Sequence, residues 1–325
     1  MRLATLRDGS RDGALLVVSQ DGRRATAATS IARSLQGALD DWERCCPSLK
    51  ELANTLEAGR AAAFPLSVEK LAAPLPRAAE WIDGSAYLNH VRLVRRARNA
   101  EPPETLESDP LVYQGGSSDL LGPRDPFQLV DPAFGLDFEA ELAVVLDDTP
   151  CGTTRENASQ HVRLLVCLND WTYRNLVPSE LAKGFGFFCS KPATAFAPFA
   201  VTPDELGADF SGGRLSGSMH VLLDGERVGH PQTGGEMHFS FFELVAHVCK
   251  TRRFGAGTIL GSGTISNQDA TRGVTCLQEL RARETIASGA PQTPFLKVGS
   301  RVSIDFRLPS GHAPFGDMQH EVIGA

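Results

Sequence analysis

The sequence predicts a mostly β protein of the α+β class, in which a small N-terminal β-rich domain precedes a larger β domain. Short apolar segments separated by glycine and proline turns recur through most of the chain, as expected for strands. Helical periodicity is confined to a few stretches, and the strand–helix alternation of a doubly wound parallel sheet is missing. With 325 residues, the chain is long enough for one large β domain and a small satellite.

The N-terminal domain is expected to combine a small hairpin sheet with helices. In residues 1–30, short apolar runs such as 14–18 alternate with Asp-Gly turns, which favours hairpins. Residues 31–58 look helical because their apolar residues recur at spacings of three and four. Prolines at positions 65, 74 and 76 then interrupt the pattern. We therefore place a domain junction near residue 75, which divides the chain into domains 1–75 and 76–325.

Strand-like segments dominate the larger domain. They cover residues 138–146, 164–168, 219–223, 258–261 and 301–306. One helix is expected from Ser240, because Ser240 and Glu243 have the spacing of a capping box and an apolar stripe at helical spacing follows. His247 lies on that helix, where a structural histidine is expected.

Composition argues against several classes of function. Charged residues make up 22% of the chain, the formal net charge is −7, and both signs are interspersed, which disfavours nucleic acid as a partner. The seven cysteines form no CxxC pair, so neither a disulfide framework nor a zinc ribbon is expected. No apolar run reaches the length of a membrane span, and residues 1–9 lack the core of a signal peptide. We therefore expect a soluble cytoplasmic protein without a membrane partner.

The sharpest chemical signal is a pair of glutamates, Glu139 and Glu141, on a predicted strand. Side chains two residues apart on a strand point to the same face, with Cα atoms about 7 Å apart. Two such carboxylates beside apolar neighbours resist burial unless a cation neutralises them. A hard cation such as Mg²⁺, Mn²⁺ or Ca²⁺ is the natural partner. The alternative, the polar face of an exposed strand, stays open.

A third carboxylate, Asp170, follows the apolar strand 164–168 and is expected to open a loop. It is a candidate to complete a carboxylate cluster, and Arg174 would approach the same ligand from one helical turn away. An Asn-Asp turn with a helix N-cap is the alternative. The glycine-rich stretch 261–267 does not fit a phosphate cradle and is expected to be a hairpin turn. The four arginines within 92–98 form either a solvated helix face or a site where one arginine faces an anionic ligand.

Taken together and in this order, these segments resemble the fumarylacetoacetate hydrolase family over roughly residues 76–310. The resemblance implies a metal held by four carboxylates, which are Asp83, Glu139, Glu141 and Asp170. His90 stands seven residues after Asp83, where the family's eukaryotic-type branch has a histidine base. Glu279 is similar to the glutamate that orients that base.

The resemblance also implies substrate contacts and a fold. The family's arginine, lysine and threonine, which contact the substrate's carboxylate and carbonyl oxygens, correspond to Arg174, Lys191 and Thr264, and Tyr113 is similar to its substrate-binding tyrosine. The larger domain is expected to be a mixed β-sandwich roll, commonly in a homodimer. The small N-terminal domain would resemble an SH3-like barrel.

Two departures from the family pattern bear on the substrate. Val177 stands where true fumarylacetoacetases have a glutamine that helps to bind the developing oxyanion, and the valine side chain cannot donate a hydrogen bond. Residues 114–116 read Gln-Gly-Gly in place of the family's His-Gly-Arg. A related 1,3-dicarbonyl or acylpyruvate substrate is therefore favoured over fumarylacetoacetate itself.

The expected function is a metal-dependent hydrolase that cleaves a carbon–carbon bond in a 1,3-diketo acid. His90 would activate water and Lys191 would offset substrate charge, with Mg²⁺ as the favoured metal and Mn²⁺ or Ca²⁺ as alternatives. Because the family also hosts decarboxylases and isomerases of small keto diacids, that reaction class stays open. A non-catalytic small-acid binding protein is the alternative from another class.

Overall fold

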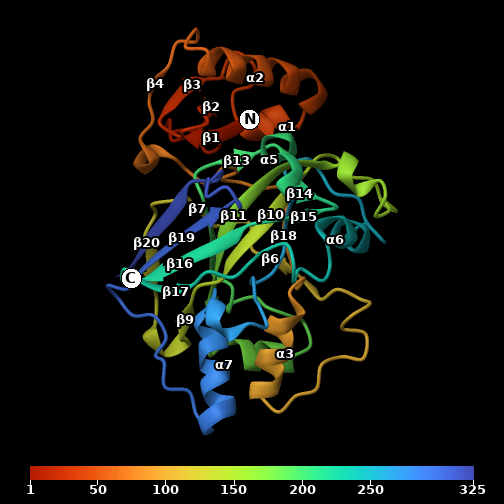
Figure 1. The fold of residues 1–325 in the computed structure, drawn as a ribbon, viewed down its shortest axis with the longest axis vertical. Helices are drawn as coiled ribbons and strands as arrows, with labels where there is room; N and C mark the ends of the chain where they lie inside the picture. The colour runs from red at the N-terminus through yellow and green to blue at the C-terminus, as the bar shows by residue number, and fades with distance from the viewer.

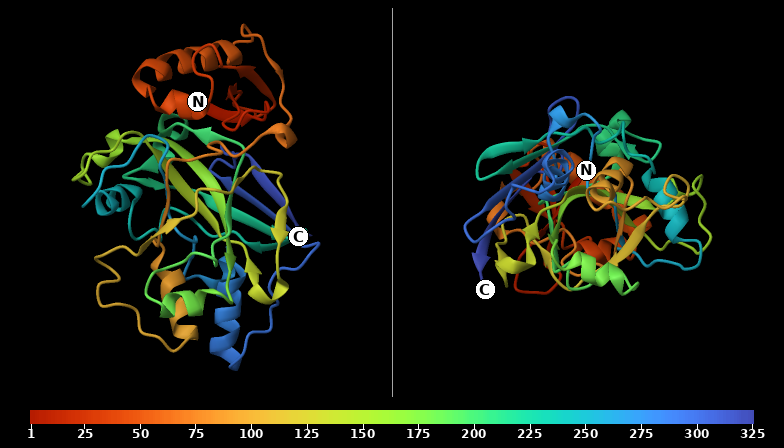
Figure 2. Two further views of the ribbon diagram at one scale, coloured as in Figure 1. Left: turned by 180° about the vertical axis from the view of Figure 1, so that it is seen from behind. Right: turned by 90° about the horizontal axis from the view of Figure 1, so that it is seen from below.

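The computed structural model describes all 325 residues and confirms the mostly β fold, with mixed sheets and few helices (Figure 1). The N-terminal domain caps one end of the larger domain, and helices α3 (Leu88–Ala97) and α7 (Leu277–Ser288) lie at the opposite end (Figure 2). None of the helices is both long and apolar enough to cross a membrane.

The expected small hairpin sheet forms at the N-terminus. Its four antiparallel strands are β1 (Arg2–Leu6), β2 (Ala14–Val18), β3 (Arg24–Ala27) and β4 (Phe64–Pro65). Helices α1 (Leu35–Leu39) and α2 (Trp42–Glu57) follow β3, as the periodicity of residues 31–58 predicts. After β4 the chain returns to β1, where Leu71 bridges Leu6 and the Arg7 N–H donates to the Lys70 carbonyl oxygen at 3.0 Å. The segment after β4 therefore runs back along the first strand of the sheet, and the SH3-like barrel stays a prediction.

β1 also joins these four strands to nine strands of the larger domain, so that all of them belong to one 13-stranded mixed sheet. Beyond β1 the order of strands is β13 (Ala200–Val201), β11 (Val162–Tyr173), β10 (Ala140–Leu146), β18 (Ile259–Gly261), β5 (Trp81–Gly84) and β6 (Val112–Gly115). Three short strands pair beside this row, namely β7 (Leu120–Leu121), β9 (Leu136–Asp137) and β12 (Ala193–Phe196). β10 and β11 are antiparallel, whereas β18 and β5 are parallel. Strands far apart in the sequence thus become neighbours.

A five-stranded sheet packs against the central strands. Its order is β17 (Glu226–Gly229), β16 (Ser218–Leu223), β19 (Arg301–Arg307), β20 (Asp317–Gly324) and β8 (Phe127–Leu129). The buried side chains of this sheet share a core of 52 residues with one face of β10 and β11. The other face of β10 and β11 packs in a second core, of 27 residues, with the N-terminal domain. Burial on both faces explains why β10 reads as a nearly continuous apolar run.

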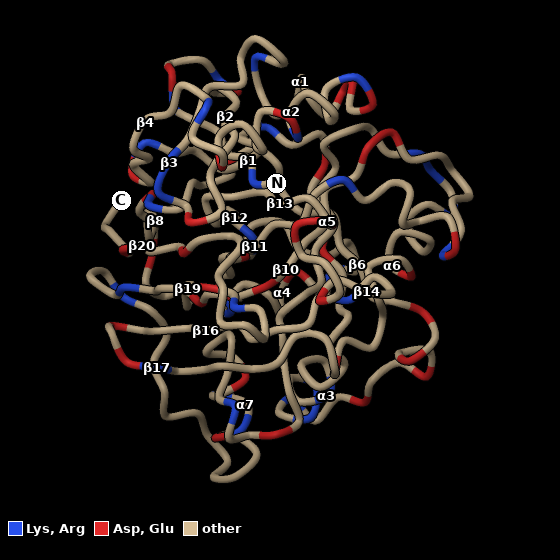
Figure 3. The backbone as a smooth tube through the Cα atoms, turned by 45° about the horizontal axis from the view of Figure 1, so that its top comes forward, with Lys and Arg blue, Asp and Glu red and all other residues tan.

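Short elements complete the chain. α6 (Phe241–Val248) begins at Ser240, and both hydrogen bonds of the predicted capping box are present. The remaining helices and strands are α4 (Val177–Ala182), α5 (Pro203–Leu206), β14 (Phe210–Ser211) and β15 (Arg214–Leu215). Five 3₁₀ segments are η1 (Val68–Lys70), η2 (Pro132–Phe134), η3 (Ala158–Gln160), η4 (Gly207–Asp209) and η5 (Ala270–Arg272). Basic and acidic residues alternate along the backbone without sorting into single-sign regions (Figure 3).

Candidate active site

Three of the predicted carboxylates converge at the centre of the large sheet. Asp83 lies on β5, Glu141 on β10 and Asp170 on β11, and their carboxylate oxygens lie within 4.8 Å of one another. All three side chains are buried. The convergence depends on sheet order, because β18 pairs with both β10 and β5 and so brings Asp83 next to the other two strands.

This carboxylate cluster has the properties of a divalent-cation site. Both carboxylate oxygens of Glu141 are buried and have no hydrogen-bond partner. Burial, with the neighbouring charges of Asp83 and Asp170, raises the pKa of Glu141 well above its usual value. Burial and the charge of Asp170 likewise raise the pKa of Asp83 to about 8. The unpartnered Glu141 oxygens beside the buried Asp83 and Asp170 carboxylates fit a hard divalent cation, which would neutralise their charge.

Glu139, the fourth predicted ligand, lies beside this cluster with different partners. Its Oε1 accepts hydrogen bonds from Arg174 Nη2 at 2.6 Å and Thr264 Oγ1 at 2.7 Å, and its Oε2 accepts from Lys191 Nζ. Burial would raise the pKa of Glu139, but the charges of Arg174 and Lys191 outweigh it and hold the pKa well below its usual value. Lys191 Nζ also donates to Asp170 Oδ2 at 2.5 Å and so links Glu139 to the cluster. Metal ligation by Glu139 stays a prediction.

The local backbone differs from the predicted regular strand and loop. A break between β9 and β10 contains Glu139, whose N–H donates to the Asn169 side-chain Oδ1 at 2.9 Å. The prediction that Asp170 opens a loop is wrong, because β11 continues to Tyr173 by pairing with β12 and β9. Arg174 therefore reaches the site from the end of an extended strand and not from a helical turn.

The predicted histidine and glutamate are brought together by packing of α3 on α7. His90 Nδ1 lies 2.8 Å from Glu279 Oε1, and Glu279 is fully buried. With the Nδ1 proton donated to this carboxylate, Nε2 carries the free lone pair. His90 Nε2 lies 4.0 Å from Glu139 Oε1 and thus faces the carboxylates. The Cys276 thiol also lies within 4.8 Å of the His90 and Glu279 ligand atoms.

Tyr113 and the glycine-rich stretch both support the cluster. The Tyr113 hydroxyl donates to Asp170 Oδ2, and burial raises the pKa of this tyrosine well above its usual value, so the hydroxyl stays protonated. The Gly263 N–H donates to Asp83 Oδ1 at 2.9 Å. The hairpin predicted for residues 261–267 is absent, because β18 is followed by a loop packed on β5. Gly263 has a φ of 75°, and a Cβ there would lie 2.3 Å from the Gly84 carbonyl oxygen, which excludes larger residues.

Asp137 and Thr194 complete the polar network, and sequence reasoning assigned them no role. Asp137 Oδ2 accepts from Arg174 Nε at 2.8 Å, while its Oδ1 accepts the Leu277 N–H at 2.7 Å at the start of α7. It therefore couples the arginine to the helix that carries Glu279. The spacing of Asp137 two residues before Glu139 was a usable signal for a shared strand face. Thr194 Oγ1 donates to Asp170 Oδ1 at 3.1 Å, and no sequence signal pointed to it.

Part of this network lines one cavity of about 520 Å³, whereas Glu141 and Asp170 lie behind its wall. Its polar lining includes the predicted residues Asp83, His90, Tyr113, Glu139, Arg174, Lys191 and Thr264. Val177 contributes an apolar wall, as its replacement of a glutamine implies. Arg95 of α3 and Arg98, which follows the helix, also line the cavity, whereas Arg92 pairs with Glu107 outside it. The arginine-rich stretch thus combines both predicted alternatives, a solvated face and arginines that face a site.

Comparison with known proteins covers nearly the whole chain. Residues 80–323 match the family model described as fumarylacetoacetate (FAA) hydrolase C-terminal, and residues 1–77 match fumarylacetoacetase N-terminal domain 2. The chain belongs to the fumarylacetoacetate hydrolase family. An oxaloacetate tautomerase of Bacillus subtilis is 27% identical over 226 residues, which cover 69% of this chain and 70% of that protein.

Solved structures confirm the fold of this family member. Fumarylacetoacetate hydrolase from Exiguobacterium antarcticum aligns with a TM-score of 0.70 at 20% identity, over 100% of both chains. Maleylpyruvate hydrolase from Sphingobium sp. SYK-6, in complex with manganese(II) and pyruvate, aligns with a TM-score of 0.68 at 18% identity, also over 100% of both chains. Relatives of this chain therefore include both hydrolases and a tautomerase.

Proposed function

We propose that this chain is a divalent-metal-dependent hydrolase that cleaves a carbon–carbon bond in a 1,3-diketo acid of the fumarylacetoacetate or acylpyruvate type. The observation that carries the proposal is the His90–Glu279 pair, whose free imidazole nitrogen faces the carboxylates across one cavity. A positioned histidine with a buried carboxylate partner is the arrangement that general-base activation of water requires.

Asp83, Glu141 and Asp170 would hold the metal, with Glu139 as the predicted fourth ligand. When bound, a divalent cation would polarise the attacked carbonyl and offset the charge of the departing enolate. The manganese and pyruvate in the Sphingobium maleylpyruvate hydrolase support both a divalent metal and a 2-keto acid product. Mg²⁺ remains the favoured metal for this chain.

In the proposed reaction His90 Nε2 takes a proton from water, and the water oxygen adds to the acyl carbonyl carbon. The bond between that carbon and the central methylene breaks, and the electron pair stays on the methylene fragment. That fragment is protonated, so the products are a carboxylic acid and a 2-keto acid. Glu279 holds the ring in orientation and stabilises its protonated form. A positioned base of this kind contributes about a hundred- to ten-thousandfold in rate.

Lys191 and the three arginines of the cavity would receive the negative charges of the substrate. Burial would lower the pKa of Lys191, but Asp170 and Glu139 raise it, so the amine stays cationic. Its ammonium group would offset the charge of the substrate's 2-keto carboxylate. Arg174 would share this role, and both cations are already paired with carboxylates of the site, Arg174 with Asp137 and Glu139 and Lys191 with Glu139 and Asp170. Arg95 and Arg98 remain to receive a second carboxylate at the far end of the substrate.

Hydrolysis of an acylpyruvate panel in the presence of Mg²⁺ or Mn²⁺ tests the proposal. The wild-type protein should release pyruvate, and His90→Ala should lower kcat by at least about a hundredfold while it retains the metal. Arg96→Ala is the matched control, because Arg96 is exposed on the same helix. Retention of most activity by His90→Ala would refute the role of His90. Absence of turnover across the panel would instead favour a small-acid binding protein.

A metal-dependent tautomerase or related isomerase or decarboxylase of a keto diacid is the second candidate. It is favoured by the B. subtilis oxaloacetate tautomerase, which aligns with 69% of this chain, and by the lack of a hydrogen-bond donor at Val177. In a tautomerase, His90 would move a proton between carbon and oxygen without consuming water. Reaction in ¹⁸O-labelled water separates the two, because hydrolysis places the label in the new carboxylate and tautomerisation does not.

A further inference from the structure

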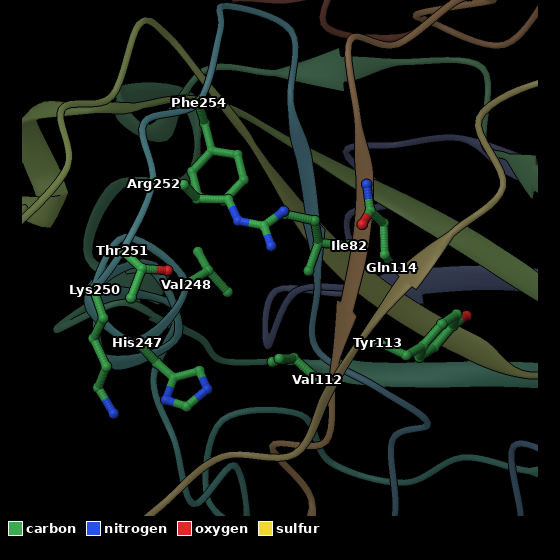
Figure 4. Close-up of a pocket in the computed structure, with 10 residues that line it drawn as sticks. All are labelled: Ile82, Val112, Tyr113, Gln114, His247, Val248, Lys250, Thr251, Arg252 and Phe254. Atoms are coloured by element: carbon green, nitrogen blue, oxygen red, sulfur yellow. The ribbon is translucent and has the colours of Figure 1, made fainter. Parts of the chain in front are cut away.

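A second cavity, of about 380 Å³, lies on the reverse face of the β5–β6 strand pair (Figure 4). Its strand side is formed by Ile82, Val112 and Gln114, with Tyr113, which lines both cavities, and its other side by the end of α6 and residues of the segment 250–254. Asp83 and Tyr113 alternate with these strand residues and pair with each other across β5 and β6. The active site and the second cavity therefore share one two-stranded wall.

The lining of this second cavity combines an apolar surface with one unpaired cation. Ile82, Val112, Val248 and Phe254 supply the apolar surface. The Arg252 guanidinium extends over the cavity between Phe254 and Ile82 (Figure 4), and it makes no hydrogen bond or ion pair with the protein. An unpaired guanidinium beside an apolar surface fits a carboxylate with an apolar body.

The other polar groups around the cavity do not oppose the binding of a carboxylate at Arg252. Lys250 Nζ and His247 Nδ1 lie 3.3 and 3.4 Å from the same Asp109 oxygen, so one carboxylate serves two basic groups. Burial, helped by the charge of Lys250, lowers the pKa of His247, which leaves a neutral imidazole at pH 7. Its Nδ1 is buried, and the contact with Asp109 lacks the geometry of a hydrogen bond. Gln114 offers an amide at the opposite side of the cavity.

We propose that this cavity is an effector site for a small monocarboxylate with an aromatic or aliphatic body. The ligand's carboxylate would bind Arg252, and its body would lie against Ile82 and Val112. Because those two residues adjoin Asp83 and Tyr113 in β5 and β6, occupation of the cavity changes the wall that carries one predicted metal ligand and the hydroxyl donor to another. Ligand binding and metal binding are then coupled, and the coupling is reciprocal.

Calorimetric titration of the full-length protein with benzoate tests the binding site, with benzyl alcohol as an uncharged probe of similar size. Benzoate should bind with one-to-one stoichiometry and a dissociation constant of about 1 mM or tighter, and benzyl alcohol should not. Arg252→Glu and Val112→Trp should each weaken benzoate binding by about tenfold or more. Both residues are exposed, so these variants should fold. Arg253→Ala, an exposed neighbour outside the cavity, is the control.

Two results would overturn the proposal. Equal benzoate affinity in the wild type and both cavity variants, or loss of binding on Lys191→Met alone, would place benzoate in the active site. Coupling is tested by titrating Mn²⁺ with and without saturating benzoate, where the Mn²⁺ affinity should change about fivefold or more. An unchanged Mn²⁺ affinity in the benzoate-saturated protein would refute the effector role.

Discussion

Substitution of Glu141 by glutamine should remove the metal response of this protein without destabilising the metal-free form. In the metal-free protein the Glu141 oxygens have no hydrogen-bond partner, and two other carboxylates lie within 4.8 Å. If Glu141 and a neighbour were both ionised at that separation, they would repel by roughly 3–4 kcal/mol at an effective dielectric constant of about 20, and burial together with this repulsion raises the pKa of Glu141. An uncharged glutamine relieves that repulsion, so the metal-free Glu141→Gln protein should unfold at the same temperature as the wild type or higher.

In the presence of metal, the wild type should instead unfold at a higher temperature than Glu141→Gln. At a Mn²⁺ concentration of about a hundred times the dissociation constant, a bound metal stabilises the folded wild type by about 2.7 kcal/mol. For a chain of 325 residues, that corresponds to a rise in Tm of about 4 °C. Glu141→Gln should lose most of this rise, because the amide replaces a charged ligand. Far-UV circular dichroism, with and without Mn²⁺ after chelation, measures both temperatures.

An exposed glutamate provides the control for this prediction. Glu226→Gln, on β17, should keep the wild-type Mn²⁺ response. The reasoning is refuted if Glu141→Gln retains the full metal-induced rise in Tm. It also fails if the metal-free variant unfolds many degrees below the wild type, because Glu141 would then be a structural group in the absence of metal.

Three further predictions concern pH, the base and the substrate's charge. Because the pKa of Asp83 is about 8 in the folded metal-free protein and about 3.9 in an unfolded chain, the folded form binds the extra proton between these values. The Tm of metal-free protein should therefore fall as pH rises from about 6 to about 8, and a pH-independent Tm would contradict this. Glu279→Gln should lower kcat by about tenfold or more with little change in KM, and the steady-state kinetics should recover with Glu279→Asp if the carboxylate orients His90. Arg98→Ala should raise KM for diketo acids with two carboxylates more than for those with one, whereas equal effects on both substrates would exclude a role in binding the second carboxylate.

Local sequence patterns predicted the parts of the site that depend on neighbouring residues. The two-residue spacing of Glu139 and Glu141 predicted that both side chains share one side of a strand, since strand alternation is a local property. Glu141 joins Asp83 and Asp170 and Glu139 lines the cavity, although Glu139 lies in the break between β9 and β10. The capping box at Ser240 predicted the start of α6 for the same reason. The resemblance to a family, carried by an ordered set of segments, supplied Asp83 and His90, which no local pattern could have joined to the glutamates.

What the sequence determined by itself is therefore the kind of groups available and the side of each strand that carries them. Tertiary structure decided which groups meet. Asp170 proved to lie within β11, because pairing with β12 and β9 extends the strand beyond its apolar run. Glu139 forms ion pairs with Arg174 and Lys191, whereas the carboxylate of Glu141 lies beside those of Asp83 and Asp170. These outcomes depend on strand order and on the balance of charges in a buried space, which contacts between residues distant in the sequence create.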